Sequence, residues 1–287
     1  MQTPKRFLRL LVHRVDGSRG LSALCAGYER GRWRSEQLAK HIIDWIPHFA
    51  LSSEELEAID PGNLMDLVRK ATRAVYETEK YQLRGEFGEI LLHGLMCDVM
   101  QSTPAIRKIF FKDAANDVVK GFDAVHVVAD EDRFELWLGE SKFYDDVNRA
   151  IREVLEDLEK HLEMRYVRRE FAAITNKLDR SWPHAEKLRL LLSEEKSLDE
   201  IFDGIRIPVL LTYDSPTIGS HSAVTAAYES AFASEVERYN EKLSNQLTEL
   251  EKRQGFEVRI HLFLVPLETK KELLHQLQTR LKAAQSI

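Results

Sequence analysis

The stretch Gly121–Lys142, GFDAVHVVADEDRFELWLGESK, decides the fold that we expect for this chain. Apolar and polar residues alternate in two runs, which predicts β-strands at Gly121–Ala129 and Arg133–Phe143. The short acidic segment between the runs is typical of a tight turn. We therefore expect a β-hairpin here, with the rest of the chain arranged around it.

A turn centred on Glu131 and Asp132 fixes the register of this hairpin, because it places Asp123 opposite Glu140. Side chains alternate between the two faces of a strand, so Lys142 lies on the same face as Glu140. Two carboxylates and one ammonium group are therefore expected together at one end of a largely apolar surface. Buried charges of this kind cost several kcal/mol unless they are paired or bind a cation.

A divalent metal ion explains such a cluster well. Two nearby carboxylates suit Mg²⁺, which keeps several of its waters and takes only one or two carboxylates from the protein. A lysine beside the ion can orient or deprotonate a water and can offset negative charge in the transition state. The expected chemistry is the hydrolysis of a phosphodiester.

The residues Gly121-Phe122-Asp123, followed after sixteen residues by Glu140-Ser141-Lys142, resemble the signature of the PD-(D/E)XK nucleases, although the proline is absent. The resemblance implies an α/β fold with a restriction-endonuclease-like core, in which helices flank a mixed central sheet. It also implies that Asp123, Glu140 and the backbone carbonyl of Ser141 bind Mg²⁺, or Mn²⁺ in its place. Lys142 would then assist the attacking water.

A wider stretch is similar to a narrower family, HamA, the nuclease subunit of the bacterial Hachiman anti-phage system. The similar segments are RGEFGEILLHGLM from Arg84, KGFDAVHVV from Lys120 and LWLGESKFY from Leu136. This resemblance implies DNA as the substrate, a HamB-like helicase as the partner, and a hetero-complex as the working form.

The segment Arg84–Met100 is predicted to be an apolar helix that carries two acids, Glu86 and Glu89, beside its buried stripe. Nucleases of the resembled type place a glutamate from the first core helix in the metal site. Gly88 would let the chain at Glu89 approach the sheet closely, whereas Glu86 is nearer the apolar stripe. Either glutamate could take this role, and either could equally be an ordinary solvated residue.

We divide the chain into a mainly helical accessory region at 1–80, a nuclease core at 81–180 and an α/β extension at 181–287. The extension is expected to pack on the core or to bind a partner. In the first region, residues 6–15 could form an edge strand, and the pattern becomes helical from Leu21.

Three further strands are predicted after the hairpin. Glu170–Thr175 would complete the nuclease core, and Pro208 suggests that the strand Ile205–Tyr213 lies at an edge or begins there. The alternating segment Phe256–Pro266 predicts a strand on which His261 occupies a half-exposed face.

Composition limits the classes of function. The 287 residues carry a net charge of −6, which argues against a protein that coats nucleic acid by itself, because phosphate neutralisation requires clustered Lys and Arg. Basic runs at Lys5–Arg14, Arg30–Arg34 and Arg165–Arg169 are short. A nuclease this acidic would depend on a partner to deliver its substrate.

No apolar run approaches the roughly 18 residues that span a bilayer, and no cleavable signal pattern is present, so we expect a cytoplasmic protein without membrane contact. Cys25 and Cys97 lack metal-ligand spacing and are expected to be inert buried thiols. A competing hypothesis is a catalytically silent subunit that keeps the nuclease fold and regulates a helicase. A metabolic hydrolase finds no support, since GxSxG, P-loop and HExxH motifs are all absent from the sequence.

Overall fold

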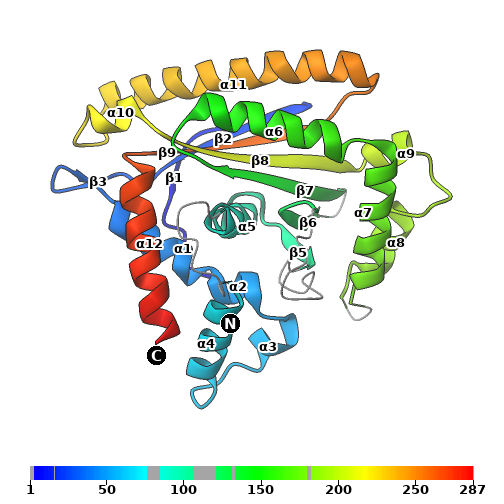
Figure 1. The fold of residues 1–287 in the computed structure, drawn as a ribbon, viewed down its shortest axis with the longest axis horizontal. Helices are drawn as coiled ribbons and strands as arrows, with labels where there is room; N and C mark the ends of the chain where they lie inside the picture. The colour runs from blue at the N-terminus through cyan, green and yellow to red at the C-terminus, as the bar shows by residue number, and fades with distance from the viewer. Residues whose placement is uncertain are drawn as a thin grey trace.

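The fold is a mixed α/β arrangement with one large sheet between layers of helices (Figure 1). A computed structural model describes residues 3–15, 17–75, 85–106, 121–130, 133–179 and 182–286. In the described residues the large sheet has seven strands in the order β1-β2-β9-β8-β7-β6-β5. The central neighbours β2, β9, β8 and β7 are parallel, whereas the pairs β1–β2, β7–β6 and β6–β5 are antiparallel.

The strands of this sheet are β1 (Arg9–Arg14), β2 (Arg19–Cys25), β5 (Thr103–Ile106), β6 (Ala124–Ala129), β7 (Phe134–Phe143), β8 (Ile205–Asp214) and β9 (Ile260–Leu267). A separate small ribbon consists of β3 (Tyr28–Glu29) and β4 (Arg32–Trp33). The helices are α1 (Ser35–Asp44), α2 (Ile46–Ala50), α3 (Ser53–Glu57), α4 (Leu64–Val75), α5 (Glu86–Met100), α6 (Val147–His161), α7 (Met164–Lys177), α8 (Ala185–Leu191), α9 (Leu198–Phe202), α10 (Pro216–Gly219), α11 (Ala226–Gln254) and α12 (Lys270–Gln285).

Different helices cover the two faces of the sheet. Helix α6 packs on β7 and β8, and the long helix α11 runs beside α6 and over β1 and β2 (Figure 1). Helix α5 packs on β6 and β7 from the other side, where α1, α2, α4 and α12 form a further helical layer. This layering explains why the central strands are buried on both faces.

The predicted hairpin register is confirmed. Val125 lies opposite Leu138 and Ala129 opposite Phe134, and the ladder runs without a shift as far as Ala124 and Gly139. The predicted pair of Asp123 and Glu140 lies one step beyond this ladder. The turn itself, at Glu131 and Asp132, lies outside the described residues. Alternation along β7 therefore directs Glu140 and Lys142 to one face and Ser141 to the other.

The edge strand predicted within residues 6–15 is also confirmed, since β1 forms one edge of the sheet. The prediction of a helical pattern from Leu21 was wrong, because Leu21 lies in β2. A short apolar run that is buried on both faces carries no clear periodicity, so strand and helix are hard to distinguish there.

The edge position predicted from Pro208 was wrong, because β8 lies between β7 and β9 in the middle of the sheet. The β7–β8 ladder pairs Trp137 with Arg206 and resumes at Glu140 with Val209. At the interruption, Gly139 and Pro208 are not paired in this ladder. The central strand therefore accommodates a residue without an N–H where its pairing with β7 is interrupted.

Two further predictions were wrong. Residues 170–175 belong to helix α7, because Val167, Phe171 and Ile174 are buried at spacings of four and three residues, which is a helical period. His261 is fully buried at 0% exposure rather than half-exposed, because β9 is a central parallel strand with both faces covered.

All three of the predicted regions contribute strands to the same sheet, since β1 and β2 precede residue 80 and β8 and β9 follow residue 181. In the part of the chain that the structure describes, no helix is long and apolar enough to cross a membrane.

Candidate active site

The first component of the candidate site is Asp123, directly before β6. Its backbone N–H donates to the carbonyl of Gly139 over 2.7 Å, directly beyond the last ladder pair, Ala124 with Gly139. Its carboxylate oxygen Oδ2 accepts hydrogen bonds from the N–H and the Oγ–H of Ser141, each over 2.9 Å. Asp123 is thereby fixed at the end of β7 that carries Glu140 and Lys142.

Glu140 is the most buried acid of this group, with 3% exposure. One of its carboxylate oxygens lies 2.5 Å from Nδ1 of His161, a residue of the last turn of α6. His161 in turn stacks on Tyr166 with 4.7 Å between ring centroids and contacts Phe122 edge-on at 5.0 Å. The imidazole that pairs with Glu140 is therefore held in place by two aromatic rings.

Lys142 has a second partner on the same helix. Its Nζ donates to Oδ2 of Asp157 over 2.5 Å, and its side chain is only 12% exposed. Asp157 and His161 lie four residues apart on α6 and so share one face of that helix. This face packs against the side of β7 to which Glu140 and Lys142 point.

The charges of the site influence one another strongly. Burial raises the pKa of the Glu140 carboxyl, and the neighbouring Asp123 raises it further, although His161 and Lys142 act in the opposite direction. Burial by itself would lower the pKa of Lys142, but the carboxylates of Asp157, Glu140 and Asp123 outweigh burial and raise it. The pKa of His161 is raised in the same way, mainly by Glu140. The structure therefore brings Asp123, Glu140 and Lys142 into one electrostatically coupled cluster.

The first turn of α5, with Glu86 and Glu89, lies on the opposite face of β7. A Cβ on Gly88 would lie 3.2 Å from Oγ of Ser141, which confirms the close approach to the sheet expected at this glycine. Glu86 and Glu89 are both half-buried. Which of them extends to the acidic pair stays a prediction.

The donor set at the site is one of hard oxygens, namely the carboxylates of Asp123 and Glu140. Among the described residues, no third His, Cys, Asp or Glu joins these two at a spacing that closes a three-ligand metal site. Two carboxylates are sufficient for an ion such as Mg²⁺, which keeps most of its waters. The residues present therefore fit a hydrated hard cation better than a dehydrated soft one.

Comparison with known proteins assigns the chain to a family. The HamA family model matches residues 5–281, which is nearly the whole chain. The chain belongs to the HamA family. Membership gives it a role in Hachiman anti-phage defence. No curated protein matches the chain.

In this HamA chain, sequence reasoning did not find Asp157 and His161. The available signal was their position on the predicted helix after the Glu-Ser-Lys strand, where they flank the buried residues Val154 and Leu158. An acid and a histidine beside a core stripe indicate polar partners on the facing strand. The separation of more than fifteen residues from Glu140 concealed that those partners are the candidate site.

Proposed function

We propose that this HamA chain is a Mg²⁺-dependent DNA nuclease with a PD-(D/E)XK-like site, the effector of its defence system, and that a partner helicase controls it. The observation that carries this proposal is the convergence of Asp123, Glu140 and Lys142 at the end of the β6–β7 hairpin. Mn²⁺ is expected to substitute for Mg²⁺, since both take oxygen ligands.

In the proposed mechanism, Asp123, Glu140 and the carbonyl of Ser141 would hold the metal ion. When bound, such an ion lowers the pKa of a water and neutralises charge on the phosphate oxygens. Lys142 is already held by Asp157 and keeps its proton because its pKa is raised. An ammonium group in this position can orient the attacking water and stabilise the negative charge that develops on the phosphorus oxygens.

Partner control is supported by the pairing of the two residues that would act on substrate. Glu140 contacts His161 and Lys142 contacts Asp157, and all four side chains are at most one-third exposed. DNA needs these groups to be accessible, so α6 must move relative to β7 before cleavage. A helicase partner that shifts α6 would turn the nuclease on.

The same pairing also favours a second function, a catalytically silent subunit that only regulates the helicase. In that case the ion pairs with α6 would be permanent structural contacts. The two functions differ in one measurable property, which is the cleavage of DNA.

The test is cleavage of plasmid and single-stranded DNA by the purified chain, with Mg²⁺ or EDTA and with or without its helicase partner. We expect Glu140→Gln to reduce Mg²⁺-dependent cleavage by at least about 100-fold, the loss typical of removing one preorganised charge-stabilising group. Lys142→Ala should give a similar loss. The matched control is Glu235→Gln, which changes another buried glutamate, one that accepts hydrogen bonds from Ser215 and Thr217.

Cleavage that survives in Glu140→Gln would exclude this metal site. If the folded wild-type chain binds its partner but cleaves no DNA under any condition, the silent regulatory subunit is the correct function.

A further inference from the structure

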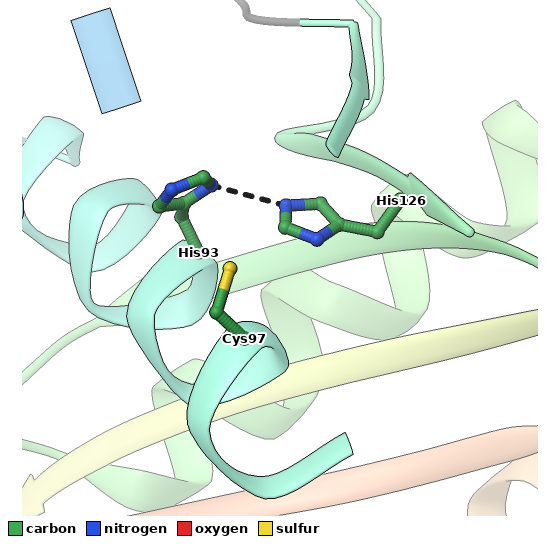
Figure 2. Close-up of side chains that lie close together, drawn as sticks. All are labelled: His93, Cys97 and His126. Carbon is green, nitrogen blue, oxygen red and sulfur yellow. Dashed lines mark hydrogen bonds between the residues drawn. The ribbon is translucent and has the colours of Figure 1, made fainter. Parts of the chain in front are cut away.

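A second cluster of chemically reactive side chains lies on the α5 side of the sheet. His93 and Cys97 of α5 and His126 of β6 point toward one another (Figure 2). Each offers one ligand atom, and these three atoms all lie within 4.8 Å of one another. His93 is 4% exposed and His126 is 1% exposed, whereas Cys97 is half-buried.

The fold brings these residues together although they are distant in sequence. His93 and Cys97 are four residues apart and so lie on one face of α5. His126 pairs with Trp137 across the β6–β7 ladder, on the same face as Gly139. That face is covered by α5, since a Cβ on Gly139 would lie only 2.7 Å from Leu92 of this helix.

The geometry of the two imidazoles resembles that of ligands around one ion. Nδ1 of His93 lies 3.1 Å from Nε2 of His126. Two nitrogens bound to a tetrahedral Zn²⁺ at about 2.0–2.1 Å would be about 3.4 Å apart, so only a small adjustment is needed. The other ring nitrogen of His126, Nδ1, lies 2.8 Å from Oγ of Ser102. A hydrogen bond of this kind orients the ring and fixes the tautomer of metal-bound histidines.

We propose that His93, Cys97 and His126 form a binding site for a transition metal, with Zn²⁺ as the preferred ion. Two imidazoles and one thiolate are ligands that Zn²⁺ prefers and Mg²⁺ does not. Three protein ligands leave a fourth position for water, which can reach the site from the half-buried side of Cys97. The site is therefore chemically distinct from the oxygen cluster of Asp123 and Glu140.

The ion would hold together two elements of the proposed nuclease site. Helix α5 carries Glu86 and Glu89 on its first turn, and β6 begins directly after Asp123. A metal bound between His93 and His126 ties this helix to this strand. A ligand that binds the native state but not the unfolded state stabilises the native state by mass action. Zinc should therefore stabilise the fold whether or not the chain cleaves DNA.

The alternative is an ordinary hydrogen bond between two neutral imidazoles, which needs no metal. In that case one of the two facing ring nitrogens carries the proton and donates the hydrogen bond, and the other nitrogen accepts it. The Cys97 thiol takes no part in this bond. A metal site needs the Cys97 thiolate as a ligand, whereas the hydrogen bond between the imidazoles does not, so removal of the thiol distinguishes the two arrangements.

The experiment uses the full chain, purified with a non-chelating reductant and without EDTA. Elemental analysis should find one zinc ion per chain. After removal of zinc and titration with CoCl₂, we expect a thiolate-to-cobalt charge-transfer band in the near ultraviolet. Cys97→Ser should lose this band, whereas Cys25→Ser should keep it, because the Cys25 thiol is buried on β2 and forms a hydrogen bond with the hydroxyl group of Tyr228.

Two further variants sharpen the result. His126→Ala should weaken zinc binding by more than the 10–100-fold that loss of an outer-shell partner causes. Glu140→Gln should keep one zinc per chain, so failure of the nuclease proposal and failure of this one are distinguishable. Wild-type chain that contains no stoichiometric zinc and gives no cobalt band would overturn the proposal, as would a band that persists in Cys97→Ser. The wild-type cobalt spectrum decides the matter even if a variant does not fold.

Discussion

At the scale of single residues, the buried ion pairs of the candidate site demand a functional reason. A buried carboxylate such as Glu140 is costly, and a buried ion pair contributes little more to folding than well-packed apolar residues of similar volume. Glu140 and Lys142 nevertheless both lie on β7 and pair with His161 and Asp157 of α6. The nuclease chemistry that we propose for this site gives the two pairs a reason other than stability.

His261 is a buried titratable residue whose effect on stability has a definite sign. Burial lowers its pKa to about 3, and the nearby charges of Arg206 and His13 act in the same direction. The unfolded chain, with a histidine pKa of about 6.5, binds this proton more readily than the native state does. The contribution of His261 to stability is therefore complete above about pH 6.5 and is lost as the pH falls toward 3.

We expect His261→Gln to flatten the dependence of stability on pH in this range. The wild type should lose up to about 1.4 kcal/mol of unfolding free energy per pH unit below 6.5 through this residue, and the variant should not. Urea unfolding at several pH values measures the effect. His275→Gln, which changes an exposed histidine of α12, is the control and should follow the wild type. Equal slopes for both variants would contradict the assignment.

At the scale of elements, the sequence pattern predicted those strands whose pairing is determined by residues close together in the chain. The alternation in residues 121–142 predicted both strands of the hairpin and their register, because an antiparallel pair joined by a short turn is specified by its own sequence. The neighbours of β7 and β2 in the parallel part of the sheet were not predictable in this way. Parallel partners are joined by long crossovers, and their strands read as continuous apolar runs.

The same limit explains which site residues were found. Asp123, Glu140 and Lys142 lie on one hairpin, so spacing alone brought them together. Asp157 and His161 reach the site only because α6 packs on β7. No spacing between residues in the sequence predicts this packing.

Gly139 tests how closely α5 and the hairpin must pack. A Cβ at this position would lie 2.7 Å from Cδ2 of Leu92 on α5 and 2.9 Å from the Cβ of Ala124 on β6, so Gly139→Ala overpacks the space between the hairpin and α5. Overpacking of this kind costs about 1–3 kcal/mol, which urea unfolding would measure. Gly219→Ala is the matched control, because a Cβ there meets no atom within 4 Å. A Gly139→Ala variant as stable as the control would show that α5 does not pack as tightly as described.

At the scale of the whole molecule, the sheet joins parts of the chain that are far apart in sequence. Strands β8 and β9 lie between β2 and β7, so the N-terminal strands reach the hairpin only through the C-terminal ones. The chain carries a net charge of −6. Under the proposed function, a partner rather than the chain itself would therefore attract DNA.

This topology predicts the behaviour of a shortened chain. Residues 1–179 lack β8 and β9, so β7 and β2 would each lose the strand that pairs with one of their edges. Helix α6 would also lose its contact with β8. We expect this fragment to show no cooperative urea transition and rapid proteolysis, because unpaired central strands expose both backbone groups and apolar side chains. Co-expression with residues 182–287 should restore a cooperative transition and co-purification of the two pieces. If residues 1–179 alone unfold cooperatively with the stability of the full chain, the seven strands do not form one interdependent sheet, and the C-terminal part is a separate folding unit.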